Sequence, residues 1–159
     1  MLVPVKKQNS RYQHKSYEQE ELELAALKKD YFALRQADCD LVQYGQCRLE
    51  LGQQQDKAQS IVVCAAISEV FGLVHYSVVE KRAMNGEDLV GFLLQLRARM
   101  GMSRTIVAFG DNSSINRSNA VKGCCQQMDI TQLFNVTYRP DLLGINKLWD
   151  QVRESHQRT

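Results

Sequence analysis

The sequence has 159 residues, enough for one domain with a single hydrophobic core. Apolar residues make up 44% and charged residues 24%, a balance typical of folded globular proteins, which excludes disorder over the whole length. The formal net charge of +2 and the pI of about 8.3 fall short of the strongly basic balance of a dedicated nucleic-acid-binding protein. The net charge is therefore compatible with DNA as a partner but does not indicate it.

Cysteine content and apolar runs limit where the protein works. The five cysteines form no Cys-x-x-Cys pair, which argues against a disulfide framework and against a zinc site. No apolar run reaches the roughly 18 residues of a membrane span, and the first residues contain no apolar segment of a secretory signal. We expect an intracellular protein, nuclear or cytoplasmic, with no membrane partner and no small-molecule cofactor.

The chain begins with a basic stretch and a helix. Residues 1–15 are expected to be a disordered tail, with basic residues and no acid, that either touches nucleic acid or is simply solvated. Residues 16–40 are expected to form a helix preceding the fold, because apolar residues recur at three- and four-residue spacing from Ser16 to about Ala37. That apolar face consists of Leu24, Leu27, Tyr31 and Leu34.

Three strands are predicted next. Leu41–Leu51 is a strand candidate interrupted by Gly45, and the polar residues 52–58 predict a loop. Ser60–Ser68 is apolar almost throughout, as in a strand buried on both faces. Gly72–Lys81 is rich in β-branched and aromatic residues, so these last two segments predict an antiparallel hairpin.

The second half alternates helices and strands. Asn85 is expected to cap a helix, with Asp88 at the capping-box position. The pattern then predicts a strand at Thr105–Phe109, a polar turn at 110–118, a helix around 120–128, a strand at Thr131–Tyr138 and a helix at Leu142–Ser155. In the last strand Phe134, Val136 and Tyr138 are expected to share a face, and Pro140 to end it. This order predicts an α/β fold with a mixed sheet flanked by helices.

Asp111 and Asn112 follow directly after a predicted buried strand. Sites in open α/β sheets collect at the carboxyl ends of strands, and a carboxylate there can hold a hard divalent cation. An Asp-Asn turn before a helix is also a common structural feature, so spacing alone leaves both interpretations open.

Two segments together resemble mariner-type DDE transposases and their bacterial insertion-sequence relatives. Gly110–Asn116 is similar to the family's Asp-Asn-x-x-x-His motif, and Tyr138–Trp149 is similar to its Tyr-Ser-Pro-Asp-Leu-Asn-Pro-Ile-Glu-x-x-Trp motif. The last carboxylate of the family falls on Asn146, and 34 residues separate it from Asp111, the spacing that the family uses. The resemblance spans Ser60–Glu154 and implies a ribonuclease H-like mixed sheet, with a DDE domain at residues 41–156. The positions that match in register are Tyr138, Pro140, Asp141, Leu142, Ile145 and Trp149.

The resemblance implies a metal-dependent chemistry that this sequence supports only in part. In the family three carboxylates hold two Mg²⁺ ions for phosphodiester cleavage and strand transfer. Asp111 is the second carboxylate and candidate metal ligand, but the third position is the neutral amide Asn146 with Lys147 beside it. Asp150 replaces it only if the helix slides by about 5 Å. The family's motif His is Asn116 here, and its Pro is Gly144.

The first carboxylate has no clear counterpart. In the strand Leu41–Leu51, Gly45 stands where Asp is expected. Asp40 is the nearest acid, and Asp30 is a second candidate under another alignment, although either can simply be a solvated side chain. The linker after this strand is shorter than the family's, and the first 40 or so residues leave no room for the helix-turn-helix region that reads transposon ends.

Three functions remain open from the sequence. The first is a degenerate transposase-derived domain with little or no nuclease activity. The second is a weak metal-dependent nuclease that uses Mg²⁺ or Mn²⁺ on Asp111 with Asp30, Asp40 or Asp150. The third is a non-enzymatic module that binds nucleic acid or protein on the same fold. The resemblance implies DNA as a partner and leaves a homodimer open.

Overall fold

The computed structural model describes residues 16–54 and 57–158. The basic tail predicted for residues 1–15 lies outside the described residues. The helices are α1 Tyr17–Gln36, α2 Gly86–Met100, α3 Asn119–Gln127 and α4 Ile145–Gln157, with a short 3₁₀ helix at Pro140–Leu142. The strands are β1 Cys39–Gln54, β2 Lys57–Ser68, β3 Gly72–Glu80, β4 Thr105–Gly110 and β5 Ile130–Phe134. None of the helices in the described ranges is long and apolar enough to cross a membrane.

The strands form one mixed sheet in the order β3-β2-β1-β4-β5. Strand β2 is antiparallel to both β1 and β3, whereas β4 runs parallel to β1 and β5 runs parallel to β4. The predicted antiparallel hairpin and the predicted mixed α/β sheet are therefore confirmed. Parallel pairing of β1, β4 and β5 brings their carboxyl ends to one edge of the sheet.

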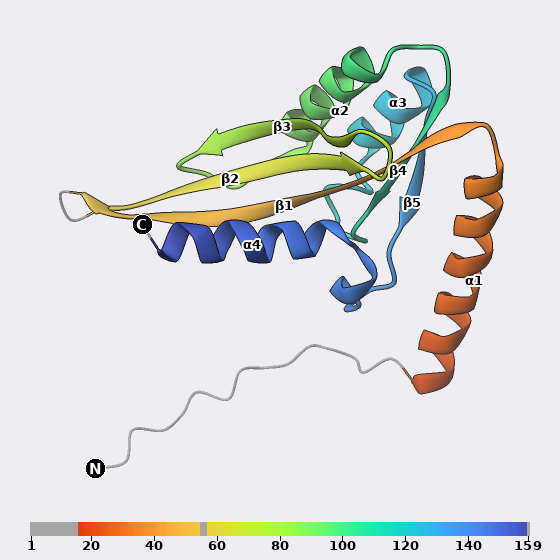
Figure 1. Cartoon of the computed structure of the whole chain (residues 1–159), viewed down its shortest axis with the longest axis horizontal. Helices are drawn as coiled ribbons and strands as arrows, with labels where there is room; N and C mark the ends of the chain where they lie inside the picture. Colours follow the sequence, from red (N-terminus) through yellow and green to blue (C-terminus); the bar gives the residue numbers. More distant parts are fainter. Residues whose placement is uncertain (1–15, 55–56, 159) are drawn as a thin grey trace.

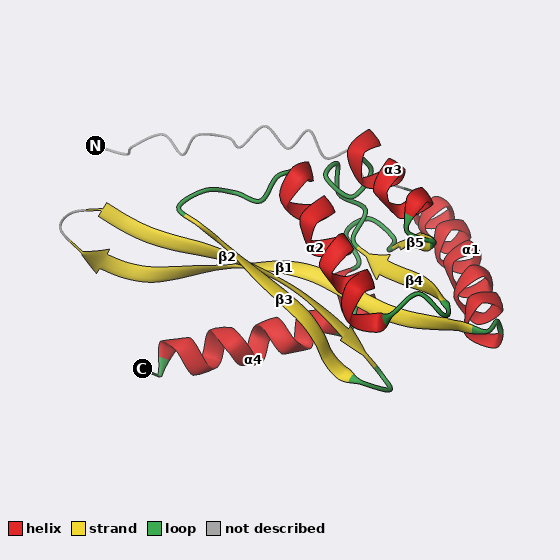
Figure 2. Ribbon diagram, turned by 90° about the horizontal axis from the view of Figure 1, so that it is seen from above, coloured by secondary structure: helices red, strands yellow, loops and turns green. Residues whose placement is uncertain are grey.

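Helices cover both faces of the sheet (Figures 1 and 2). Helices α2 and α3 lie over one face, and their apolar side chains join those of the strands in one buried cluster. Helix α4 runs along β1 on the opposite face, where a second cluster contains the buried Ile145 and Trp149. Three of the four residues predicted as the apolar face of α1, Leu27, Tyr31 and Leu34, pack against that second cluster.

Helix α2 begins where the sequence predicted. The side chain of Asn85 accepts a hydrogen bond from the Asp88 backbone N–H, and the Asp88 carboxylate accepts one from the Asn85 N–H. Arg82 donates to the same carboxylate and, as the largest cause, lowers the pKa of Asp88 to about 2. This capping box fixes the first turn of the helix that covers the hairpin.

Two predicted boundaries were wrong. Residues 52–58 were expected to form a loop, but β1 continues to Gln54 and β2 begins at Lys57, with Gln54 paired to Lys57. The backbone at this end of β1 and β2 projects beyond α2 and α3 (Figure 1) and continues the antiparallel pairing. The last strand was expected to reach Tyr138 but ends at Phe134, and Tyr138 has a φ of 64° that no strand residue adopts.

A buried arginine that the sequence did not reveal ties the helical layer to the sheet. Arg97 is 2% exposed, and its guanidinium donates only to backbone carbonyls. The acceptors lie at the end of α2, before β4 and in the turn between α3 and β5: Gly101, Arg104, Met128 and Asp129. A buried charge is tolerated here because its donors are satisfied by carbonyl dipoles.

We predict that Arg97→Met destabilises the fold by about 3 kcal/mol or more, because methionine removes the charge-assisted hydrogen bonds that join the end of α2, the segment before β4 and the turn before β5. The measurement is urea unfolding followed by the fluorescence of Trp149, the single tryptophan, which is buried. Arg99→Met, at an exposed position of the same helix, is the control and is expected to change stability by less than about 0.5 kcal/mol. Equal stability of the two variants would contradict the assignment.

Candidate active-site cavity

A cavity of about 310 Å³ opens at the carboxyl edge of the parallel strands. Its walls come from β1, from the loops that follow β4 and β5, and from the start of α4. Gly45, Asp111 and Asn146, the three positions that the resemblance assigns to the carboxylates, all line it. We call it the triad cavity.

The parallel register between β1 and β4 explains why Gly45 and Asp111 lie together. Gln43 pairs with Phe109, so continuing the same register places Gly45 level with Asp111, just beyond the end of β4. Ile145 and Asn146 at the start of α4 close the cavity from the other side. Residues from three distant parts of the sequence are thus brought to one point by the sheet.

Gly110 lets the end of β4 sit against Tyr44 of β1. A Cβ atom at position 110 would lie 2.6 Å from the Tyr44 ring, so any larger residue would force the ring away. Tyr44 is buried, and this burial raises its pKa far above the ordinary value, with the charges of Cys125 and Asp111 acting in the same direction. The tyrosine therefore stays neutral beneath the cavity.

Asp111 is fixed by Asn116, the residue at the family's His position. The Asn116 side chain donates to the Asp111 carboxylate at 2.6 Å and to the Asp111 backbone carbonyl at 2.8 Å. Asn116 is itself buried, and its backbone carbonyl accepts a hydrogen bond from Gln132 of β5. Among the described residues that line the cavity, Asp111 is the one carboxylate, and one of its oxygens is already engaged by an amide.

Asn135 lies in the loop after β5, which forms one wall of the triad cavity. The sequence alone did not point to this residue. Its backbone N–H donates to Gly110, its side-chain oxygen accepts from Val136, and its side-chain nitrogen donates to the Arg139 carbonyl. These bonds end β5 and turn the chain back over the cavity. In the sequence Asn135 falls inside the predicted strand Thr131–Tyr138, whereas β5 ends one residue before it.

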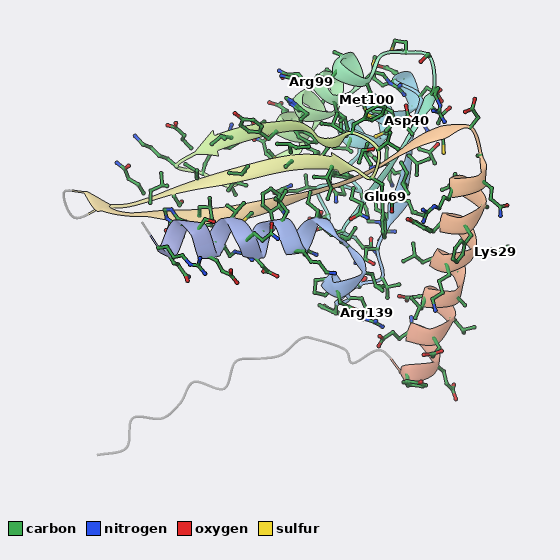
Figure 3. The ribbon with its side chains drawn as sticks, in the orientation of Figure 1. Lys29, Asp40, Glu69, Arg99, Met100 and Arg139 are labelled. Carbon is green, nitrogen blue, oxygen red and sulfur yellow. The ribbon has the colours of Figure 1, made fainter. Side chains whose placement is uncertain are left out.

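Arg139 joins this wall to α1 (Figure 3). Its guanidinium donates to Glu20 of α1 and to Asp141, each at 2.9 Å. The charge of Arg139 is therefore matched by two carboxylates at the rim.

Gln43 positions the helix that carries Asn146. Its side-chain oxygen accepts a hydrogen bond from the Ile145 N–H at 3.1 Å, which caps the first turn of α4 from β1. A Cβ atom at Gly144 would lie 3.1 Å from that same oxygen. The glycine at the family's Pro position therefore makes room for the Gln43 cap.

Helix α4 packs tightly against β1 at Gly45. A Cβ atom at position 45 would lie 3.3 Å from Ile145 Cγ2 and 3.4 Å from Trp149 Nε1. Trp149 Nε1 is buried and has no hydrogen-bond partner in the described part of the chain. The space that a side chain at this position needs is therefore partly taken by α4.

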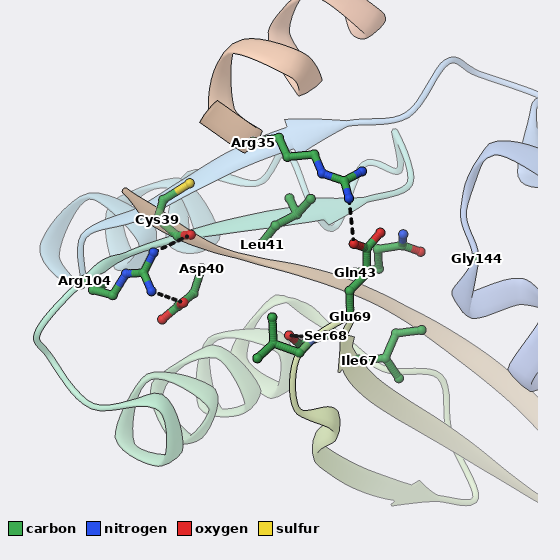
Figure 4. Close-up of a pocket in the computed structure, with 11 residues that line it drawn as sticks. Arg35, Cys39, Asp40, Leu41, Gln43, Ile67, Ser68, Glu69, Arg104 and Gly144 are labelled. Carbon is green, nitrogen blue, oxygen red and sulfur yellow. Dashed lines mark hydrogen bonds and ion pairs between the residues drawn. The ribbon is translucent and has the colours of Figure 1, made fainter. Parts of the chain in front are cut away.

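The alternative acids lie outside the triad cavity. Asp40 pairs with Ile106 at the start of β1, five residues before Asp111 along the register and so about 16 Å away. It forms an ion pair with Arg104 at 3.2 Å and lines a separate cavity of about 530 Å³ (Figure 4). Asp30 lines a third cavity, beside α1 and β5. Asp150 is exposed on α4 and pairs with Arg153.

The donor set of the triad cavity does not fit the two-metal centre that the resemblance implies. Glycine offers no side-chain oxygen, Asn146 offers a neutral amide, and one oxygen of Asp111 already accepts from Asn116. Mg²⁺ gives up water reluctantly and requires anionic oxygen ligands. Across the described residues, no cluster of three or more His, Cys, Asp or Glu side chains is arranged to hold a metal ion.

Neither a protein-family model nor a curated protein sequence matches this chain. Several solved structures, by contrast, superpose on this chain. The catalytic domain of Mos1 mariner transposase superposes with a TM-score of 0.75 at 13% identity, over 99% of this chain and 77% of that one. The same domain with raltegravir and Mg gives a TM-score of 0.74 at 12% identity, over 91% and 76% of the two chains.

Two larger assemblies also match. The Mos1 paired-end complex with Mn superposes with a TM-score of 0.72 at 12% identity, over 90% of this chain and 51% of that chain, so this chain spans about half its length. A simian T-cell lymphotropic virus intasome matches less well, with a TM-score of 0.53 at 14% identity, over 74% and 39% of the two chains. The chain therefore has the ribonuclease H-like fold of mariner-type DDE transposase catalytic domains.

Proposed function

We propose that this chain is a transposase-derived, DDE endonuclease-like domain that no longer cleaves DNA. The observation that carries the proposal is the triad cavity itself, where a glycine, one aspartate and an asparagine occupy the three positions that carry carboxylates in the family. The ancestral activity implied by the fold is DNA cleavage and strand transfer with Mg²⁺ or Mn²⁺.

Charge is the main reason for the loss. Two divalent ions bring four positive charges, which three carboxylates offset in large part but one carboxylate cannot. Lys147, exposed next to Asn146, adds a further positive charge at this end of the sheet. Metal binding is therefore opposed by electrostatics as well as by the lack of ligands.

Packing supports the same conclusion. Ile145 and Trp149 stand against Gly45, so a side chain at the first position requires α4 to give way by a few tenths of an ångström. The capping of α4 by Gln43 holds that helix in place and opposes the slide that would bring Asp150 into the site.

We predict that the purified protein shows no nicking of supercoiled plasmid DNA with Mg²⁺ or Mn²⁺ above that of Asp111→Ala. One carboxylate does not hold the metal ions that activate the attacking oxygen. The measurement is the rate of conversion of supercoiled to open-circular DNA, with both proteins purified in parallel.

Metal-dependent nicking that disappears in Asp111→Ala would sink this proposal and favour a live nuclease. In that case Asp30→Asn, Asp40→Asn and Asp150→Asn would each be assayed for the second carboxylate. Loss of nicking in one of these three variants would identify the second carboxylate.

DNA binding without cleavage is a second candidate function. Arg117 follows Asp111 by six residues, Lys147 adjoins Asn146 and Lys122 lies on α3; all three are exposed. No carboxylate within the described part of the chain pairs with them, and the Arg117 guanidinium lies over the Phe134 ring at 5.8 Å. These cations can therefore meet phosphates, the contacts that dominate affinity for DNA.

We predict that affinity for duplex DNA falls with salt, with a slope of log K against log [salt] near −3 if all three cations contact phosphates. Lys147→Gln should reduce the steepness of the slope by about 1. The measurement is fluorescence anisotropy across a salt series. A flat response would exclude phosphate contacts and leave a protein partner or none.

A further inference from the structure

Helix α1 reaches the rim of the triad cavity through one ion pair. Arg139, which lines the cavity, donates a hydrogen bond from Nη1 to Glu20 of α1 at 2.9 Å. Asp141 accepts from the other side of the same guanidinium, from Nε and from Nη2, each at 2.9 Å. The two carboxylates use different nitrogens of Arg139, so Glu20 can leave while the pair with Asp141 stays intact.

Helix α1 is packed loosely for a helix of 20 residues. None of its side chains is buried, and cavities of about 220 Å³ and 320 Å³ lie between it and the strands β1, β4 and β5. Besides the apolar contacts of its inner face, an ion pair near each end holds it, Glu20 with Arg139 and Arg35 with Glu69. Ion pairs that are this exposed contribute little to stability. The first half of α1 is therefore easily displaced from the rim.

That first half is strongly acidic. Residues 17–27 contain no basic residue and four glutamates, which are Glu18, Glu20, Glu21 and Glu23. The helix dipole favours acids in the first turn, but its effect falls off beyond that turn and does not account for Glu21 and Glu23. Glu23 lines a cavity with Phe134, the ring over which the Arg117 guanidinium lies. The negative charge of α1 therefore lies at the same edge of the sheet as cations proposed to meet phosphates.

We propose that the acidic half of α1 is an autoinhibitory contact that occupies the position of a DNA phosphate on Arg139. Duplex DNA displaces Glu20 and adds the Arg139 guanidinium to the cations already proposed as phosphate contacts. A phosphate suits this exchange because, like a carboxylate, it accepts charge-assisted hydrogen bonds from a guanidinium. The inference rests on DNA binding, the second candidate function above, and adds to it a competition within the chain.

The exchange changes the charge of the rim in favour of DNA. While Glu20 is bound, Arg139 sets one positive charge against two carboxylates, so the cluster is net negative and repels phosphates. Once Glu20 leaves, the cluster with Asp141 is neutral and Nη1 is available as a donor. Because a phosphate then replaces the carboxylate on the same nitrogen, Arg139 loses no hydrogen bond.

The test is fluorescence anisotropy of a labelled duplex across a salt series, with the full chain and its variants. Glu20→Gln should raise affinity at low salt about threefold or more. It should also steepen the slope of log K against log [salt] by about 1, because one more phosphate contact forms.

Glu21→Gln is the matched control. It removes the same charge from the same helix, at an exposed position that has no ion pair among the described residues. It should change affinity less than about twofold and leave the slope unchanged, because it frees no guanidinium.

Arg139→Gln shows whether the gain depends on this arginine. In that background Glu20→Gln and Glu21→Gln should bind DNA equally well, since the proposed phosphate contact is gone. The emission of Trp149 checks that each variant is folded. If Arg139→Gln does not fold, the comparison of the two glutamate variants decides alone.

Hydrogen exchange gives a second readout of the displacement. Amides in residues 17–27 should exchange faster once DNA is added, because the half-helix leaves the rim. Unchanged or slower exchange there overturns the inference, as do equal effects of the two glutamate substitutions or a gain from Glu20→Gln that persists without Arg139. These results leave DNA binding itself standing. If neither the unmodified protein nor Glu20→Gln binds DNA with a salt dependence, DNA binding fails and the inference fails with it.

Discussion

The contact between α4 and β1 at Gly45 determines how closely the helix approaches the sheet beside the triad cavity. Gln43 caps the helix from the strand, and Ile145 and Trp149 then lie within 3.4 Å of where a Cβ atom at position 45 would stand. A glycine at this position permits that approach, and a larger residue would require the helix to give way by a few tenths of an ångström. The helix that carries Asn146 is thus held close to the sheet, beside the position that has no side chain.

The sheet and the metal ligands of the family depend on different residues of this fold. The sheet still brings three positions to one point, since register and strand order depend on apolar packing and backbone pairing. In the family that the fold resembles, metal binding depends on three anionic side chains, and our proposal assigns two of these positions to Gly45 and Asn146, which carry no charge. Asn116 further stabilises the loop after β4 by binding the remaining carboxylate, a role that needs no metal. The proposed loss of catalytic ligands is compatible with this architecture, because fold stability and catalysis depend on different residues.

Patterns of apolar residues predicted most of the architecture, and local polar chemistry accounts for what was missed. The hairpin, the capping box at Asn85 and the strand before Asp111 follow from periodicity and cap signals, which act over a few residues. Arg97, Gln43 and Asn135 were missed because each acts on backbone groups that are distant in sequence or beyond a turn. For the cavity, the resemblance supplied Asp111, Gly45 and Asn146. The exclusion of Asp40 from it required the register between β1 and β4.

The most direct test of the account is a Mn²⁺ titration followed by electron paramagnetic resonance, which counts free and bound ions. The unmodified protein should bind Mn²⁺ weakly and no better than Asp111→Asn. Gly45→Asp combined with Asn146→Glu should bind at least about tenfold more tightly, because two further anionic ligands then face Asp111. The emission of Trp149 checks that this variant is folded. Two ions bound by the unmodified protein, and lost in Asp111→Asn, would contradict the claim that one carboxylate cannot hold the metal pair.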